Sequence, residues 1–418
     1  MKLKILVVLP MYGGSLPVGR FCAEALKRQG HLVEVFEAPD FHCAFTALKG
    51  IRVSSSSLEY LENSFLQVVS SAILAKVDFF QPDLVLALAQ APLSRQALKR
   101  LRADKVRTAM WFVEDFRIFG YWRAFAPYYD VFAVIQREPF FSELKAAGVD
   151  NHLYLPMAAD PLYHKPLELG LVEQKKWGSD LSFMGAGYPN RRKAFKELTS
   201  YDFKIWGTEW DGDSILAPFV QMGGRRISSE ECVKIFNASK INLNLHSTMD
   251  QNQLVGQGDF VNPRTFELAS CAAFQLVDRR GLMDELFRDD ELAFFSDMAD
   301  LREKIDYYLA RPEDRALMAA KARKRVQSEH TYEHRMKTLV DYAVEKLGLK
   351  KESAANPVLD ELSPELRQDL ESMLARLGLS PNARFEDVVH YIRQEKGRLS
   401  PLETSILFLD EWQKQYKS

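Results

Sequence analysis

Short, almost entirely apolar runs recur along this chain, and longer helical patterns separate them. The runs in the first half are Leu3–Leu9, Leu32–Phe36, Asp83–Ala89, Arg107–Val113, Val131–Ile135 and His152–Pro156. A strand that is apolar on both faces is typical of a parallel sheet that helices cover on both sides. Strands that alternate with helices in this way predict an α/β protein built on parallel sheets.

The same pattern starts again in the second half of the chain. Its expected strands are Asp180–Met184, Phe203–Trp206, Lys240–Leu245, Ala272–Val277 and Leu292–Phe295. We therefore predict two Rossmann-like, doubly wound domains, residues 1–168 and residues 169–349, and the family resemblance described below implies that they face a cleft. The boundary between them should fall between Pro166 and Trp177.

The composition changes after residue 349. Residues 350–357 read as a polar linker, and residues 358–418 as a helical appendage whose amphipathic helices are broken near Pro381 and Pro401. One interpretation is a module for homo-oligomerisation or partner docking. The other is a helical cover on the rest of the protein.

Charge and cysteine content exclude several classes of protein. A net charge of −2 gives no reason to expect nucleic-acid binding, which needs a concentrated basic face. Cys22, Cys43, Cys232 and Cys271 lack metal-type or redox-type spacing, so we expect reduced thiols. The first apolar run stops at Pro10 without a cleavage site, and no run reaches the roughly 18 residues that cross a bilayer. We expect a cytoplasmic protein and leave peripheral membrane contact open.

The stretch 258–287 carries a coherent set of candidate binding residues. Asn262 is a good N-cap and Pro263 a good first helical residue, so a helix should begin there. Free N–H groups at a helix start favour a nearby anion. In the first turns of this helix, Arg264 can reach a phosphate, and Glu267 can accept hydrogen bonds from two neighbouring hydroxyls. These residue types suit a nucleotide sugar.

From Asp180 to about Leu347, the sequence resembles the second half of two-domain, GT-B glycosyltransferases, in particular the CgeB/YkvP-type, group 1 family. In that family an acidic residue, seven further residues and a glutamate mark the donor site, and Asp259 and Glu267 have this spacing. The resemblance also implies that the last helix of the second domain, about residues 331–347, returns onto the first domain. The family usually has a glycine near position 272, where this chain has Ala272, and a left-handed turn at an alanine would cost roughly 1 kcal/mol.

Two glycine-containing loops join this implied donor site. Gly13 and Gly14 resemble the group 1 loop that faces the interdomain cleft, although alone they read as an ordinary turn. The pattern F-x-G-x-x-Y-P-x-R at 183–191 resembles the donor-side loop of the family, which would set Arg191 near the diphosphate. His246 follows a strand and is included as a binding candidate, although a single histidine is more often structural. The predicted donor-binding residues are Gly13, Gly14, Gly185, Gly187, Arg191, His246, Asn262, Arg264, Thr265 and Glu267.

Polar residues at the carboxyl ends of the first-half strands should face the same cleft. Glu114 and Asp115 are the catalytic candidates, because a carboxylate beside the reacting carbon can act as a general base or stabilise developing positive charge. The alternative is that Asp115 caps the helix after its strand. Gln136 and Arg137 follow the next strand and face the same way.

The resemblance implies a metal-independent, hexosyltransferase-like enzyme that moves a sugar from a UDP-, GDP- or TDP-linked donor, without a cofactor, to an unknown glycan, lipid or protein. We discount a metal site at Asp211 and Asp213, because helix dipoles and basic residues commonly replace the metal in GT-B proteins. The alternative is a non-catalytic protein or scaffold that keeps the fold to bind a sugar or a partner. Bacterial glycan or protein glycosylation is the expected setting.

Overall fold

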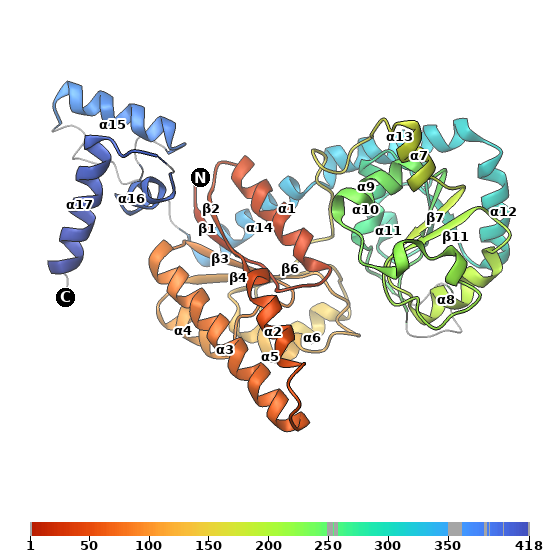
Figure 1. Cartoon of the computed structure of the whole chain (residues 1–418), viewed down its shortest axis with the longest axis horizontal. Coiled ribbons are helices and arrows are strands. Elements are labelled where there is room, and N and C mark those ends of the chain that lie inside the picture. The colour runs from red at the N-terminus through yellow and green to blue at the C-terminus, as the bar shows by residue number, and fades with distance from the viewer. Residues whose placement is uncertain are drawn as a thin grey trace. The chain divides into compact units, whose positions relative to one another are not determined.

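The computed structural model describes residues 2–248, 254, 258–349, 362–379, 383, 385–395 and 397–416. Contacts divide the chain into two compact units (Figure 1). The larger unit comprises residues 2–74 and 83–349, and the smaller one comprises residues 75–82 and the C-terminal helices. The predicted linker at 350–357 and the helix break near Pro381 lie outside the described residues.

The first half of the larger unit contains a six-stranded parallel sheet in the order β2-β1-β3-β4-β5-β6. Its strands are β1 (Lys4–Val8), β2 (Leu32–Phe36), β3 (Leu84–Leu88), β4 (Arg107–Phe112), β5 (Val131–Val134) and β6 (His152–Tyr154). The associated helices are α1 (Ser15–Arg28), α2 (His42–Leu48), α3 (Ser55–Phe80), α4 (Arg95–Ala103), α5 (Trp122–Phe125) and α6 (Phe140–Ala146). Every residue of β1, β3 and β5 is buried, as the apolar runs predict.

The second half contains a five-stranded parallel sheet in the order β11-β10-β9-β7-β8. Its strands are β7 (Leu181–Met184), β8 (Phe203–Trp206), β9 (Ile241–Asn244), β10 (Gln275–Asp278) and β11 (Ala293–Phe295). Its helices are α7 (Leu171–Trp177), α8 (Pro189–Phe195), α9 (Ser229–Ala238), α10 (Pro263–Ser270), α11 (Met283–Leu286), α12 (Met298–Leu309), α13 (Pro312–Glu329) and α14 (Tyr332–Leu347). In both halves the second strand lies outside the first, and the later strands follow on the other side. This is a doubly wound order, so the predicted fold class is confirmed.

Helix α14 completes the core of the first half. Tyr332, at its start, is fully buried and lies 5.3 Å from Phe21 and 6.2 Å from Trp111, measured between ring centroids. Arg335, one turn later, donates hydrogen bonds to the carbonyls of Pro156 and Met157. One hydrophobic cluster therefore contains residues of β1, β4, α10 and α14.

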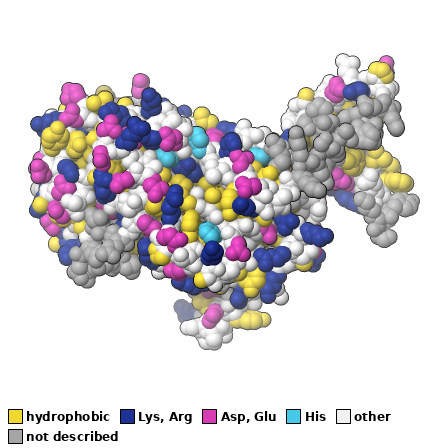
Figure 2. Space-filling model, turned by 180° about the vertical axis from the view of Figure 1, so that it is seen from behind, with side chains coloured by type: hydrophobic (Ala, Val, Ile, Leu, Met, Phe, Trp, Pro, Cys, Tyr) yellow, Lys and Arg dark blue, Asp and Glu magenta, His cyan; other side chains and the backbone are white. Residues whose placement is uncertain are grey.

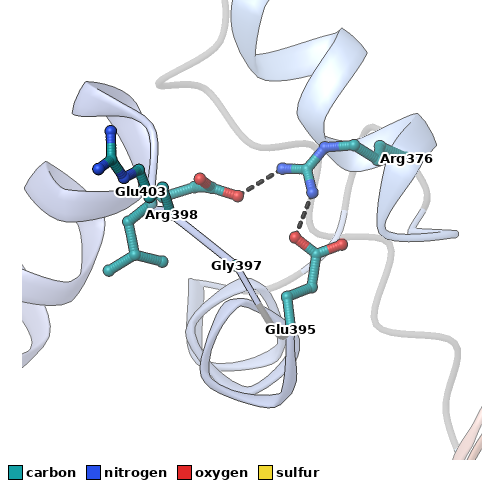
Figure 3. Close-up of a pocket in the computed structure, with 6 residues that line it drawn as sticks. Arg376, Glu395, Gly397, Arg398 and Glu403 are labelled. Atoms are coloured by element: carbon teal, nitrogen blue, oxygen red, sulfur yellow. Dashed lines mark hydrogen bonds and ion pairs between the residues drawn. The ribbon is translucent and has the colours of Figure 1, made fainter.

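The C-terminal helices are α15 (Pro364–Arg376), α16 (Phe385–Gln394) and α17 (Pro401–Tyr416). Their buried residues include Leu374, Val388, Ile392 and Ile406. Arg376 of α15 pairs with both Glu395 and Glu403, and these three side chains line a small polar pocket between the helices (Figure 3). The guanidinium of Arg376 is therefore already paired with two carboxylates of the same unit. A role in assembly remains a prediction.

Lys and Arg side chains are interspersed with Asp and Glu on the face that Figure 2 shows. Within the part of the chain that the structure describes, no helix is both long and apolar enough to cross a membrane.

Ala272 adopts a left-handed conformation, with φ of 51°, at the position where the family usually has a glycine. Its N–H donates to the carbonyl of Ala269, and the N–H of Ala273 donates to that of Leu268, so the end of α10 is closed by a Schellman motif. Glycine avoids the cost of about 1–2 kcal/mol that an L-residue meets here, although it loses about 0.4–1 kcal/mol through the freedom of the unfolded chain.

We therefore expect Ala272→Gly to raise the free energy of unfolding by about 0.5–1 kcal/mol. Ala310 ends α12 with φ of −77°, so Ala310→Gly is a matched control that should lower stability. Urea denaturation of the two variants and the wild type checks both signs. A loss of stability in Ala272→Gly would contradict the strain assigned to this position.

A buried histidine next to α14 links stability to pH. His330 donates through Nε2 to the carbonyl of Leu286 and accepts through Nδ1 from Arg335. Burial, helped by the positive charge of Arg335, lowers the pKa of His330 to about 3. The unfolded chain binds a proton near pH 6.5 while the folded protein does not, so stability is lost as pH falls below that value.

Between pH 6.5 and pH 5, His330 should reduce the free energy of unfolding by about 1.4 kcal/mol per pH unit. In His330→Gln this slope should decrease by the same amount, because the glutamine does not titrate. Denaturant midpoints measured at several pH values give both slopes, and equal slopes in the two proteins would rule out this linkage.

Candidate active site

The start of α10 is held by hydrogen bonds within the protein. As predicted, Asn262 is the N-cap, and its side chain accepts from the N–H of Thr265 at 3.1 Å. The N–H of Asn262 donates to Nε2 of His246 at 3.0 Å, and Pro263 has no N–H. Two of the N–H groups at this helix start are therefore used inside the protein, and the binding of an anion there stays a prediction. Of the amides at this end, that of Arg264 has no hydrogen bond among the described contacts.

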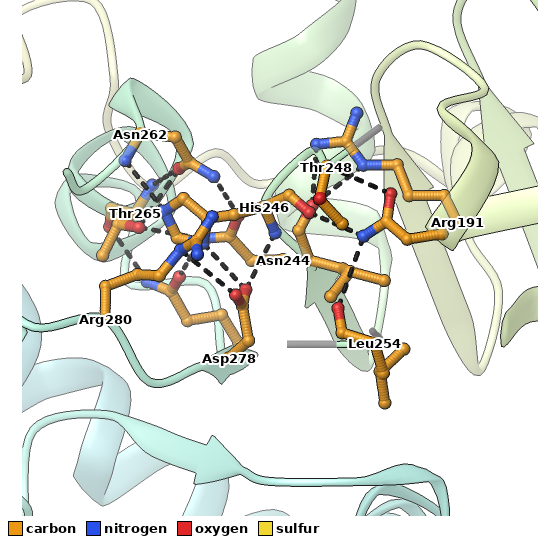
Figure 4. Close-up of polar contacts among 12 residues, drawn as sticks. Arg191, Asn244, His246, Thr248, Leu254, Asn262, Thr265, Asp278 and Arg280 are labelled. Atoms are coloured by element: carbon orange, nitrogen blue, oxygen red, sulfur yellow. Dashed lines mark hydrogen bonds and ion pairs between the residues drawn. The ribbon is translucent and has the colours of Figure 1, made fainter. Parts of the chain in front are cut away.

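His246 and Asp278 form a buried pair behind this helix start (Figure 4). Oδ1 of Asp278 accepts from the backbone N–H of His246 at 2.8 Å and from ring Nδ1 at 2.7 Å. Because Nε2 accepts from Asn262, the ring is neutral and carries its proton on Nδ1. Burial lowers the pKa of His246, whereas His246 and Arg280 offset the effect of burial and leave the pKa of Asp278 below its usual value.

Several predicted donor-binding residues are therefore used inside the protein. Both ring nitrogens of His246 have partners, and Thr265 is fully buried, with its hydroxyl between Asn244 and Asn262. Nε and Nη2 of Arg191 donate to the carbonyl of Leu245, and burial lowers the pKa of Arg191 to about 10. In the structure these side chains, and that of Asn262, hold the loops of the second half by internal hydrogen bonds. Their binding of a donor stays a prediction.

Of the predicted donor-binding glycines, Gly185 and Gly187 are closely packed inside the protein, whereas Gly14 is open to solvent. A Cβ on Gly187 would lie 2.1 Å from the carbonyl oxygen of Glu209, and one on Gly185 would lie 3.0 Å from the ring of Phe183. These two glycines therefore allow the loop after β7 to pack against the loop after β8. Gly14 is exposed and has open space around it, whereas Gly13 has φ of 103°.

Glu267 and Arg264 form an ion pair on α10, with a separation of 2.5 Å. The other carboxylate oxygen of Glu267 lies 3.9 Å from Nε2 of His164, and the guanidinium of Arg264 lies over the ring of Phe236. Both side chains remain partly exposed, 14% for Glu267 and 23% for Arg264. Of the predicted donor-binding side chains, these two charged groups combine exposure with a suitable charge.

Asp259 connects the two halves of the larger unit. Its Oδ1 accepts from Nε2 of Gln136, at the end of β5, at 2.8 Å and lies 3.5 Å from Arg117. Gln136 is fully buried and also holds the loop after β4 by accepting from the N–H of Phe116. Of the pair Asp259 and Glu267, which has the spacing of the family, Asp259 therefore contacts the first half, and Glu267 lies on α10.

Glu114 lies in a second polar cluster, after β4. Its carboxylate accepts from the hydroxyl of Tyr121 at 2.7 Å and from Nε2 of Gln90 at 2.5 Å. Burial raises the pKa of Glu114, although these two hydrogen bonds oppose the rise. Asp115 accepts from the N–H of Arg117 and from Gln136, so it fixes a turn, and no helix begins there. Asp115 therefore holds a turn, and the helix that the alternative expected it to cap does not begin there, since α5 begins at Trp122.

Sequence reasoning missed three of the residues that organise this region. Asp278 is the last residue of β10, Arg280 follows this strand, and both are buried. Arg226 donates to the carbonyl of Gly13, in the opposite half, at 2.7 Å. The charged run 278–280 directly after an apolar strand was a usable signal for the first two. Nothing in the sequence around Arg226 indicated its contact.

The described residues contain no group of three or more His, Cys, Asp or Glu side chains arranged to hold a metal ion. Asp213, of the discounted metal pattern, pairs with Lys196 at 2.9 Å.

Comparison with solved structures gives the class of fold. Sucrose-phosphate synthase from Thermosynechococcus elongatus matches with a TM-score of 0.56 and 12% identity, over 84% of this chain and 100% of that one. HepE from Anabaena, in complex with UDP-glucose, matches with a TM-score of 0.55 and 10% identity, over 82% and 100% of the two chains. The two doubly wound halves described above therefore form a GT-B fold.

Sequence comparison then shows which family of proteins this chain resembles. Residues 191–341 match the family described as glycosyl transferase-like. The spore protein CgeB of Bacillus subtilis (strain 168) is 25% identical over 259 residues, which cover 59% of this chain and 78% of that protein. The match over residues 191–341, the similarity to CgeB and the GT-B fold together support the resemblance to GT-B, group 1 glycosyltransferases that was stated from the motifs.

The close packing at Gly187 predicts that Gly187→Ala lowers the free energy of unfolding by about 1–3 kcal/mol, because backbone must move to admit the methyl group. Gly14→Ala should change it little, since Gly14 has φ of −71° and no neighbouring atom within 4 Å of the added carbon. Thermal and urea denaturation of both variants test this difference. Equal stability of the two would show that the loop after β7 tolerates a side chain.

Proposed function

We propose that this protein transfers a glycosyl group from a nucleotide-diphospho-sugar to a hydroxyl of an acceptor. The observation that carries the proposal is the contact between Gln136 and Asp259, because it joins the loops after the strands of both sheets. In doubly wound proteins, ligands bind beyond these carboxyl ends. Glu114 lies on one side of this contact and α10 on the other.

Donor binding is assigned to the second half. Glu267 would accept hydrogen bonds from hydroxyls of the donor, and Arg264 would bind its diphosphate after exchanging its contact with Glu267. We add Arg226 to this set, since it lies against the exposed loop of Gly13 and Gly14. The complex of HepE with UDP-glucose supports a nucleotide sugar as the ligand class. We propose a UDP-, GDP- or TDP-linked donor.

Catalysis would depend on orientation and on stabilising the leaving diphosphate. Arg264 and Arg226 supply positive charge for this without a metal ion or cofactor. Glu114 would act as the general base on the acceptor hydroxyl, because its raised pKa makes it a stronger base than an ordinary carboxylate. If the stereochemistry of the sugar is retained, Glu114 orients the acceptor instead.

The protein would work in the cytoplasm, on a bacterial glycan, lipid or protein, and residues 358–418 would serve a homo-oligomer or a partner. A non-catalytic, sugar-binding function is the second candidate. The internal use of His246, Thr265 and Arg191 favours it, because these side chains leave fewer groups for the donor.

Substitution of Glu267 tests the donor site. Wild-type protein should be stabilised by one class of nucleotide sugar in a thermal-shift panel of UDP-, GDP-, TDP-, ADP- and CMP-linked sugars, by about 2.7 kcal/mol at 100 times the dissociation constant. In Glu267→Gln, the affinity for that ligand should fall about 10- to 100-fold, because hydrogen bonds to a charged group are lost.

Glu230→Gln is the matched control, since this carboxylate on α9 is 77% exposed. It should bind the donor as the wild type does. Unchanged donor affinity in Glu267→Gln would remove Glu267 from the site. Donor binding without any transfer or hydrolysis of the sugar would favour the non-catalytic function.

A further inference from the structure

The first half contains a hollow of about 200 Å³ beside the Glu114 cluster. Its lining residues are Gln90, Ala91, Leu93, Met110, Tyr121, Phe125 and Tyr129. They come from the loop after β3, from β4, and from α5 and the residues that flank it. The hollow therefore belongs entirely to the first half, which faces the acceptor in the proposed function. We call it the 90–129 pocket.

The size of the 90–129 pocket limits what it can hold. Drug-sized ligands occupy pockets of about 300–1,000 Å³, so about 200 Å³ accommodates a group the size of a single ring. Its wall is largely apolar and aromatic. The rings of Tyr121 and Phe125 lie edge to face, with centroids 6.4 Å apart, which is a favourable arrangement for two aromatic rings and presents aromatic surface to the pocket.

Polar groups gather at one end of the pocket. Two lining residues, Gln90 and Tyr121, both donate to the carboxylate of Glu114, and the hydroxyl of Tyr121 accepts from the N–H of Gln90 at 3.1 Å. Gln90 also has φ of 66°, which is uncommon for a residue other than glycine. Such strain persists only where the surrounding structure imposes it, and it clusters at functional sites.

This combination selects one chemical class. A hexose would bring several hydroxyls into an apolar wall, and each one left without a partner weakens binding. An aliphatic group would leave the polar end unused. We propose that the 90–129 pocket binds a phenol: the ring occupies the apolar part, and its single hydroxyl lies at the end formed by Gln90, Tyr121 and Glu114.

The pocket deepens the proposed function, on which its role as an acceptor site rests. In the transfer, the phenol oxygen forms a bond to the anomeric carbon of the donor. The bond from that carbon to the diphosphate breaks, and its electron pair leaves with the nucleoside diphosphate. The phenol proton passes to the carboxylate of Glu114. The acceptor would therefore carry a phenolic ring, as a tyrosine side chain does.

Ligand-observed NMR with p-cresol, toluene and methyl glucopyranoside tests the pocket directly on the full chain. We expect p-cresol to bind at millimolar concentration and toluene to bind several-fold more weakly, because toluene lacks the hydroxyl. Methyl glucopyranoside should not displace p-cresol. Displacement by the glycoside at equal concentration would overturn the assignment to a phenol.

Two variants of the lining locate the binding. Ala91→Leu fills the pocket and should weaken p-cresol binding at least 10-fold, whereas Ala124→Leu, on the exposed side of α5, should leave it unchanged. Tyr121→Phe keeps the ring and removes the hydroxyl, so we expect a loss of about fivefold, the equivalent of one hydrogen bond. Equal affinity in Ala91→Leu and in the wild type would place the phenol elsewhere and overturn the proposal.

The same samples are titrated with UDP-glucose and GDP-mannose. Binding of a nucleotide sugar without binding of p-cresol would overturn the pocket assignment and leave the proposed function intact. Binding of p-cresol, lost in Ala91→Leu, without binding of any nucleotide sugar would support the pocket and count against transfer.

Discussion

The buried pair of His246 and Asp278 holds together the loops on which the second half depends. One carboxylate oxygen receives both the backbone N–H and the ring Nδ1–H of His246, and the other ring nitrogen receives the N–H of Asn262. The ends of β9 and β10 and the start of α10 are thereby joined through a single imidazole. Removing the imidazole would leave the Asp278 carboxylate and the N–H of Asn262 each without one hydrogen-bond partner, which costs about 1–3 kcal/mol for each buried group.

The polar side chains at the start of α10 have the chemistry of ligand-binding groups, and in the structure they position the helix. Asn262, Thr265 and Asn244 satisfy one another in a polar network, so contacts within the protein set the direction of α10. The charged side chains of Arg264 and Glu267 then project from a rigid element. Across from them, Gln136 fixes the loop after β4 and binds Asp259 with the same amide group.

The fold was largely predictable from the sequence, because its information is local. Strands such as Leu84–Leu88 are buried along their whole length and read as continuous apolar runs, and an Asn followed by a Pro, as at Asn262-Pro263, is typical of a helix start. The site was less predictable. Whether a polar side chain faces a ligand or the protein depends on partners that lie far away in the sequence, as Asp278 is from His246 and Leu245 is from Arg191. The 90–129 pocket likewise combines residues whose relation appears only after β3 and β4 pair.

Helix α14 follows the second half in sequence but supplies Tyr332 and Arg335 to the first half. The two halves therefore cannot be separated by cutting the chain where it passes from the first sheet to the second, because α14 would then be lost from the first half. A fragment that ends near residue 168 would lack the ring that covers Phe21 and Trp111. Exchange of the second half of this chain for that of another protein would have to leave α14 with the first half, because α14 completes the core there.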